Sequence, residues 1–371
     1  MPQPPASFSP KLSPNASGDG QHPYATLGPD TVLDALASIG LHGEGQLMAL
    51  SSYENRVYQA RLEDGSQVVA KFYRPGRWSD AQIAEEHAFS AELSAAEVPA
   101  VPPLVLHGAT LHHHAGFGFS VSPKRGGRTP ELDDDEVLEW IGRFLARLHT
   151  VGAARPFTTR PALNLATFGD EPRDWLMDHH AVPLDVLSEW KGACQEALDA
   201  VAASGLASVT PRSTATDDED DEYADGPPDQ PLPIAAIRLH GDCHPGNILW
   251  TPAESPGGGP HFVDLDDART GPAVQDLWML ASGDRRQRTG QLAMLIDGYE
   301  QVRRFDRREL ALIEPLRTLR LLHYSAWLAR RWDDPAFPAA FPWFGSSDYW
   351  RGQARTLRVQ VEAMAEPPLM V

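Results

Sequence analysis

Cysteine is almost absent from the sequence, with only Cys194 and Cys243 among 371 residues. Two thiols cannot build the disulfide framework of a small secreted protein, and they are too few for a metal site made of thiolates. Long apolar runs are also missing, and none approaches the length of a membrane-spanning helix. We therefore expect a cytoplasmic protein that has no membrane partner.

Basic residues are in deficit, because 32 Lys and Arg face 51 Asp and Glu and the formal net charge is −19. A chain this acidic repels polyanions, so we expect no nucleic acid as a general partner. A nucleotide site stays possible because it needs only a few local cations and a metal. The length and the hydrophobic content of 42% predict a globular protein of two lobes, which we expect to be a monomer.

Two stretches lack the apolar residues that a packed core needs. Residues 1–23 are rich in proline, serine and glycine, which predicts a disordered tail rather than a signal peptide. Residues 204–233 contain six consecutive acidic residues and five prolines, which predicts a disordered acidic insert.

Strand patterns dominate the first third of the chain. They predict strands over residues 46–51, 55–62, 67–73, 104–107 and 117–122, with the histidines at 112–114 in an exposed hairpin tip. The turn after the first strand has no glycine, so it is not a glycine-rich phosphate loop. Its hydroxyl residues Ser51 and Ser52, with nearby backbone N–H groups, could still approach phosphate oxygens.

The third predicted strand contains Val68-Val69-Ala70-Lys71, which resembles the V-A-I-K pattern of protein kinases. In that pattern the strand lysine pairs with the α- and β-phosphates of ATP. Lys71 would be costly to bury unpaired, so it needs a carboxylate on the next helix. Backbone groups near Ser122, on the last predicted strand of this lobe, are expected to bind adenine.

The helix that follows begins at Ser79, with Gln82 completing a capping box. It contains two adjacent glutamates, Glu85 and Glu86. Glu86 has apolar residues three and seven positions later, so we expect it to face inward and to pair with Lys71. Glu85 is expected to be solvated.

The second half of the chain is mainly helical in pattern, with helices predicted over residues 133–149, 182–202, 288–304, 307–333 and 348–364. The fourth of these contains four arginines that could recognise an acidic or phosphorylated substrate, although pairing with nearby carboxylates is their more common use. They are Arg317, Arg320, Arg330 and Arg331.

A polar loop lies between two short apolar runs, within Leu239 to Trp250. Asp242 and Asn247 have the spacing of the kinase catalytic loop H-R-D-x-x-x-x-N. In kinases the aspartate accepts the proton of the attacking hydroxyl and the asparagine holds Mg²⁺. Asp264 follows the apolar Phe262-Val263 and corresponds in order to the aspartate that holds the metal against the phosphates.

Three further residues accompany this loop. Asp266 points the same way as Asp264 if the strand continues, so it is a rival or second metal ligand. His240 occupies the position of the histidine in the kinase motif. Asp276 falls at the start of a helix, where a carboxylate is favoured. We expect His240 and Asp276 to brace the catalytic loop.

These motifs resemble the aminoglycoside phosphotransferase-like kinases, which share the protein kinase fold. Longer stretches are similar to the bacterial stress response kinase A family, namely residues 52–58, 71–75, 239–250, 262–269, 271–280 and 327–343. The resemblance covers roughly residues 24–368. It implies a cytoplasmic, ATP-dependent Ser/Thr protein kinase linked to stress and cell survival, with Asp242 as proton acceptor and Asn247 and Asp264 as Mg²⁺ ligands.

The resemblance also implies an α+β, bilobal protein kinase-like fold. Residues 24–124 would form an N-terminal ATP-binding lobe with a small antiparallel sheet, and residues 125–371 a large helical catalytic lobe. Two alternatives to a protein kinase stay open. A small-molecule kinase acting on an amino alcohol, a sugar or an aminoglycoside uses the same phosphate machinery. A non-catalytic nucleotide-binding module is opposed by the complete set of catalytic residues.

Overall fold

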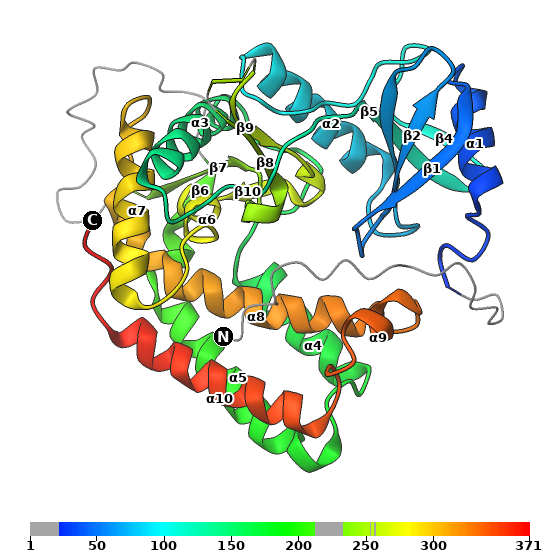
Figure 1. Cartoon of the computed structure of the whole chain (residues 1–371). Coiled ribbons are helices and arrows are strands. Elements are labelled where there is room, and N and C mark those ends of the chain that lie inside the picture. Colours follow the sequence, from blue (N-terminus) through cyan, green and yellow to red (C-terminus); the bar gives the residue numbers. More distant parts are fainter. Residues whose placement is uncertain (1–21, 212–232, 253, 256) are drawn as a thin grey trace.

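The structure is a computed structural model that describes residues 22–211, 233–252, 254–255 and 257–371. Nearly all of the predicted tail and most of the predicted acidic insert therefore lie outside the described residues. The described residues form two lobes, the smaller of which is built around a sheet and the larger around helices (Figure 1). This confirms the predicted α+β, bilobal architecture.

The small lobe contains a five-stranded antiparallel sheet in the order β1-β2-β3-β5-β4. Its strands are β1 (Gly43–Leu50), β2 (Arg56–Leu62), β3 (Gln67–Phe72), β4 (His112–His114) and β5 (Phe117–Pro123). Helix α1 (Pro29–Ser38) packs on β1 and β4, and α2 (Asp80–Ala95) lies between the sheet and the large lobe (Figure 1). Ser79 and Gln82 form the predicted capping box of α2.

Side chains alternate along β3, and this alternation fixes the direction of Lys71. Val68, Ala70 and Phe72 are buried in a core that they share with α1. Lys71 lies on the opposite face of the strand, as the two-residue period of a β-strand requires. The core of the small lobe therefore directs the lysine out of the apolar layer and toward the other lobe.

Two details of the small lobe differ from the predictions. Residues 104–107 form no strand beyond an isolated bridge between Leu106 and Ala109. His112–His114, expected at an exposed tip, instead forms β4 and pairs with β5. The chain reverses just after the triplet, at Ala115 and Gly116, which both have positive φ, so His112–His114 can pair with β5 as a short edge strand.

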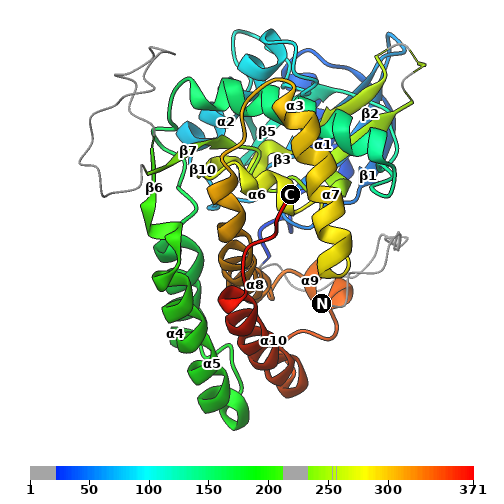
Figure 2. The ribbon, with the colours of Figure 1, turned by 90° about the vertical axis from the view of Figure 1, so that its left-hand side faces the viewer.

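Helices make up most of the large lobe. They are α3 (Asp135–Ala153), α4 (Glu171–Asp178), α5 (Leu184–Ala203), α6 (Val274–Trp278), α7 (Arg285–Glu300), α8 (Ile313–Ala329), α9 (Ala336–Ala340) and α10 (Ser347–Ala365). Short helical segments are η1 (Ala166–Asp170), η2 (Gly205–Ser208), η3 (Pro245–Asn247), η4 (Leu265–Asp267) and η5 (Arg307–Leu312). Helix α3 packs along α7, and α5 along α10 (Figure 2).

Two small sheets carry the polar loops of the large lobe. One has the order β10-β7-β6, and the other pairs β8 with β9. Their strands are β6 (Val209–Pro211), β7 (Ile234–Leu239), β8 (Ile248–Thr251), β9 (Gly259–Phe262) and β10 (Arg269–Gly271). The loop from β7 to β8 contains Asp242 and Asn247, and the chain after β9 contains Asp264.

The prediction of a disordered insert over residues 204–233 is wrong for the first part of that range. Residues 205–211 form η2 and β6, and β6 pairs in parallel with β7. The edge of β7 provides backbone hydrogen-bond partners for Val209–Pro211. These hydrogen bonds stabilise a strand there even though the sequence that follows is polar. Among the described residues, no helix is long and apolar enough to cross a membrane.

Candidate active site

The loop between β7 and β8 is fixed by a close backbone contact. Gly241 has a φ of +84°, and a Cβ at this position would come within 2.2 Å of the backbone oxygen of Asp267. Only glycine fits both requirements. The contact packs the loop that contains Asp242 directly against η4, so the loop and the acidic segment after β9 have a fixed relative position.

Asp276 braces this loop from inside the large lobe. Its buried carboxylate accepts hydrogen bonds from the backbone N–H groups of His240 and Gly241, both at 2.9 Å. The same carboxylate lies 3.0 Å from Nε2 of His149, whose Nδ1 lies 3.0 Å from the hydroxyl of Tyr299. Burial lowers the pKa of His149. A buried network of this kind is costly to break because each donor would lose its partner.

His240 connects the loop to the next strand. Its Nε2 lies 3.0 Å from the backbone oxygen of Val263, the residue before Asp264. On the loop itself, the side-chain amide of Asn247 donates to the backbone oxygen of Asp242 at 3.0 Å. The positions of Asp242, Asn247 and Asp264 are therefore tied together through short contacts.

Asp264 meets Lys71 across the cleft between the lobes. Strand β9 ends at Phe262, and Asp264 takes a left-handed conformation with φ +60°. Its carboxylate lies 2.7 Å from Nζ of Lys71 and its side chain is 47% exposed, which leaves it accessible from the cleft. Burial alone would lower the pKa of Lys71, but Asp264 and Asp266 raise it well above its usual value, so the lysine is charged.

Asp266 does not follow the predicted strand alternation. The chain turns into η4 after Asp264, and Asp266 becomes buried. Its carboxylate forms ion pairs with Arg77 and, at 3.5 Å, with Lys71, and it accepts a hydrogen bond from the Asn55 amide at 3.2 Å. Asp266 was predicted as a metal ligand on the assumption that the strand continues, and that assumption is wrong. Its carboxylate pairs instead with Arg77 and Lys71.

Glu86 is buried and inward-facing, but the predicted ion pair with Lys71 is replaced by the pairs of Lys71 with Asp264 and Asp266. Burial raises the pKa of Glu86 to about 7, although the charge of Lys71 acts in the opposite direction. A carboxyl that is easily protonated attracts the lysine less strongly than a fully ionised one does. Glu85 instead accepts hydrogen bonds from Thr158 and Thr159.

The expected nucleotide-contacting serines lie at two places around the cleft. Ser51 and Ser52 begin the loop between β1 and β2, where Ser51 is exposed and Ser52 half-buried. Ser122 is on β5, opposite Val69 of β3 and close to the connection between the lobes. The structure thus brings Lys71, Asp264, Asp266 and Glu86 together and leaves the serines at the border of the same cleft.

All four arginines expected near a substrate form ion pairs with carboxylates. Arg317 pairs with Glu314, Arg330 with Glu171 and Arg331 with Glu54. Arg320 differs because its partner is Asp242, at 2.8 Å, and because its side chain is 38% exposed. Arg320 is therefore the one of these four that borders the proposed proton acceptor.

The donor set fits Mg²⁺ bound with a nucleotide. The described residues contain no group of three or more His, Cys, Asp or Glu side chains arranged to hold a metal alone. Mg²⁺ in kinases is usually held by one or two protein oxygens together with substrate phosphates. The exposed carboxylate of Asp264 and the amide oxygen of Asn247 can supply those protein oxygens.

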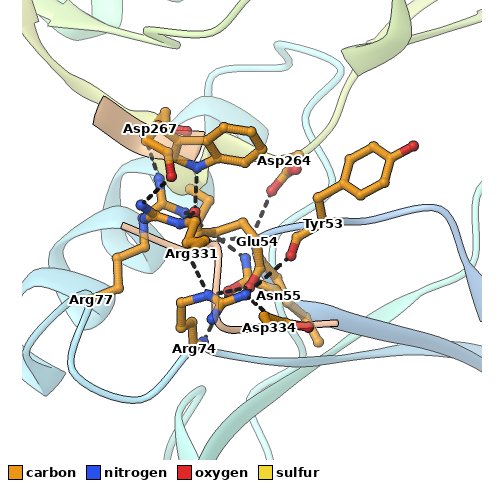
Figure 3. Close-up of polar contacts among 12 residues, drawn as sticks. Tyr53, Glu54, Asn55, Arg74, Arg77, Asp264, Asp267, Arg331 and Asp334 are labelled. Atoms are coloured by element: carbon orange, nitrogen blue, oxygen red, sulfur yellow. Dashed lines mark hydrogen bonds and ion pairs between the residues drawn. The ribbon is translucent and has the colours of Figure 1, made fainter. Parts of the chain in front are cut away.

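The sequence-based reasoning missed a cluster of charged residues beside this site (Figure 3). Four arginines and four carboxylates meet there, namely Arg56, Arg74, Arg77, Arg331, Glu54, Asp266, Asp267 and Asp334. They come from the loop between β1 and β2, the start of β2, the segments after β3 and after α8, and η4. The available signal was the family resemblance of residues 52–58, 71–75 and 327–343, since these three stretches contain most of the cluster.

The two-lobed fold, the lysine on β3 and the polar loop followed by an acidic segment define a phosphotransferase of the protein kinase-like class. The model of the family described as "Phosphotransferase enzyme family" matches residues 47–313. Among solved structures, the amicoumacin kinase hAmiN, in complex with AMP-PNP, Ca²⁺ and Ami, is similar in fold. Its TM-score is 0.64 at 18% identity, with 92% of this chain and 95% of that chain covered.

Curated relatives are much closer in sequence. The "Serine/threonine protein kinase RdoA" of Salmonella typhimurium is 46% identical over 353 residues, which cover 95% of this chain and 98% of the relative. "Stress response kinase A" of Escherichia coli K12 is 43% identical over 348 residues, with 94% and 97% covered. The chain belongs to the phosphotransferase enzyme family and, within it, to the stress response kinase A family.

Proposed function

We propose that the protein is a Ser/Thr protein kinase that uses ATP and Mg²⁺ and acts in a stress response. The observation that carries the proposal is the arrangement of Asp242, Asn247, Asp264 and Lys71 around one cleft. On the same loop, Nε2 of His244 lies 3.6 Å from the carboxylate of Asp242, and burial lowers the pKa of this histidine. The names of the curated relatives support both the protein substrate and the stress setting.

ATP would bind with its phosphates between Lys71 and the loop that begins at Ser51 and Ser52. Lys71 would leave Asp264 for the α- and β-phosphates, because a polyanion outcompetes a single exposed carboxylate. Adenine would lie toward Ser122 and the connection between the lobes. A cavity of about 500 Å³ beside that connection, lined by Gly126, Gly127 and His261, offers room for the outer part of the nucleotide.

Asp264 and Asn247 would hold Mg²⁺. When bound, the metal would neutralise charge on the transferring phosphoryl group. Asp242 would accept the proton of the acceptor hydroxyl and orient its oxygen. Because the contacts of Gly241 and Asp276 fix the backbone just before Asp242, the chain would position this carboxylate before the substrate arrives.

The acceptor side of the cleft favours a protein over a small cationic alcohol. Asp242 is bordered by Arg320, and Tyr324, one helical turn further along α8, is 37% exposed. A positive and aromatic border that is open to solvent suits a polypeptide segment. A closed acidic pocket, which an amino alcohol would need, is not what these two residues provide.

The proposal is tested with labelled ATP and a panel of acceptors comprising a generic protein substrate, choline, ethanolamine and kanamycin. We expect Mg²⁺-dependent label on Ser or Thr of protein. Asp242→Asn should bind nucleotide normally and lose about 10² to 10⁴ in turnover, the usual contribution of a general base. Near-normal turnover in this variant, or label on the small alcohols alone, would contradict the proposal.

A further inference from the structure

The loop between β1 and β2 contains no glycine, yet it lies where kinases cover the phosphates. Without glycine, the loop from Ser51 to Asn55 has fewer accessible backbone conformations than a glycine-rich loop. Asn55 is 2% exposed, receives the backbone N–H of Arg74 on its side-chain oxygen at 3.1 Å, and donates to Asp266 at 3.2 Å. The loop is therefore attached at its end to both lobes.

Asp334 is the main attachment point on the large lobe. Its side chain is 1% exposed, and it lies just before α9, beneath the small lobe (Figure 1). Both of its oxygens accept hydrogen bonds from Nη2 of Arg56, at 3.0 and 2.8 Å, and one of them also lies 2.8 Å from Nη2 of Arg74. Burial would raise the pKa of Asp334, but Arg56 and Arg74 lower it, so the carboxylate is ionised.

Glu54 makes the reciprocal contact from the loop. Its carboxylate receives Nε1 of Trp327 at 2.5 Å and forms ion pairs with Arg331 at 2.6 Å and Arg74 at 3.0 Å. Figure 3 shows the guanidinium groups of Arg74 and Arg331 gathered around this glutamate. The paired arginines offset a negative charge that would otherwise repel phosphates.

The loop tip is held by aromatic contacts as well. The ring of Tyr53 lies 5.0 Å from that of Phe341 and 6.4 Å from that of Phe337, both near α9. Ring contacts, ion pairs and an amide hydrogen bond thus connect three consecutive loop residues, Tyr53, Glu54 and Asn55, to the large lobe. The contacts with Asp266, Trp327, Arg331, Phe337 and Phe341 join the two lobes, whereas those with Arg74 stay within the small lobe.

We infer that Asp334 and Glu54 are positioning residues that latch the β1–β2 loop to the large lobe, so that its N–H and hydroxyl groups face the phosphates of the nucleotide. The latch replaces the flexible glycine-rich loop of protein kinases with a fixed one. It rests on the proposed function, because the loop matters to catalysis only if a nucleotide binds beneath it.

The test compares Asp334→Asn and Arg56→Gln with Asp333→Asn, which removes an exposed neighbouring carboxylate outside the latch. Dissociation constants are measured for Mg²⁺-ADP and, by competition, for adenosine, which has no phosphates. We expect each latch variant to bind ADP about tenfold more weakly, equivalent to about 1.4 kcal/mol, with adenosine affinity unchanged. The control should match the wild type for both ligands.

The double variant adds a second readout. Because both substitutions break one contact, Arg56→Gln with Asp334→Asn should lose little more ADP affinity than Asp334→Asn alone. If Asp334→Asn does not fold, Arg56→Gln carries the comparison, since its side chain is 21% exposed and its loss leaves Arg74 on Asp334. Unchanged ADP affinity in folded variants, or equal losses for ADP and adenosine, overturns the latch. A wild type that binds no nucleotide overturns the proposed function instead.

Discussion

The two loops that border the proposed nucleotide site are immobilised in opposite ways. The catalytic loop is held inside one lobe, where buried Asp276 receives backbone N–H groups. The β1–β2 loop is held across two lobes, where Glu54 and Asp334 receive arginine side chains. Backbone bonds inside a lobe form when the lobe folds. Side-chain ion pairs across a cleft can break without unfolding either lobe.

The contacts of the two loops should therefore respond differently to mutation. Loss of the Asp276 carboxylate would leave the buried N–H groups of His240 and Gly241 without an acceptor. This loss should mainly lower the free energy of unfolding. Loss of the latch should leave both lobes folded and should mainly lower the affinity for the phosphates of the nucleotide. Asp264 and Lys71 lie between the catalytic loop and the β1–β2 loop. Their side chains, 2.7 Å apart, connect the two lobes at the proposed site of phosphoryl transfer.

The largest effect is expected at Asp264, the proposed metal ligand that lies between the two loops. Asp264→Ala should abolish Mg²⁺-dependent phosphoryl transfer, because the charge on the phosphates would no longer be neutralised. Asp266→Ala should retain measurable transfer but weaken the contacts of Arg77 and Asn55. Transfer assays across a Mg²⁺ titration compare the two variants. Loss of transfer in Asp266→Ala alone would reverse the assignment of the metal ligand.

The internal brace should give the next largest effect. Asp276→Ala removes the acceptor of His240 and Gly241 and the partner of His149, which should lower the free energy of unfolding by about 3 kcal/mol. Urea unfolding followed by circular dichroism measures the change, with exposed Asp297→Ala as the control. A variant as stable as the control would show that the catalytic loop does not depend on this carboxylate.

The smallest effect concerns two adjacent glutamates on α2. The pKa of Glu86 is raised to about 7 by burial, so the stability it contributes is complete below its unfolded value near 4.5 and is lost as pH rises through 7. Melting temperatures between pH 5 and 8 should therefore fall for the wild type relative to Glu86→Gln. A constant difference across this range would contradict the raised pKa.

Glu85 provides the matched control. Burial would raise its pKa, but hydrogen bonds from Thr158 and Thr159 lower it to about 2. Its contribution is present above the unfolded value and disappears only as pH falls toward 2. Glu85→Gln should consequently show the same slope as the wild type between pH 5 and 8.

Much of the fold was predictable because local signals and packing agreed. The capping box at Ser79 and the third strand, predicted over residues 67–73, depend on near neighbours, and the structure confirms both. Asp264 and Asp266 show the limit of that reasoning. Alternation holds only while a strand continues, and the strand ends at Phe262 for tertiary reasons that include the close contact at Gly241.

The latch was not predictable because it joins residues far apart in the chain. Arg56 and Asp334 are separated by 278 positions, and neither has an unusual local pattern. The family resemblance identified all three contributing stretches without indicating that they meet. Only the packing of α8 and α9 beneath the small lobe brings them into contact (Figure 1).

The close approach of Gly241 to Asp267 has a consequence for how the family can diversify. It joins the loop of Asp242, the proposed proton acceptor, and the segment of Asp264, the proposed metal ligand, into one template with no room for a side chain at residue 241. Under the proposed function, variation in what is phosphorylated would arise outside this template, on the face of α8 that contains Arg320 and Tyr324. Exchange of that face between relatives would transplant acceptor choice while leaving the phosphoryl-transfer step untouched.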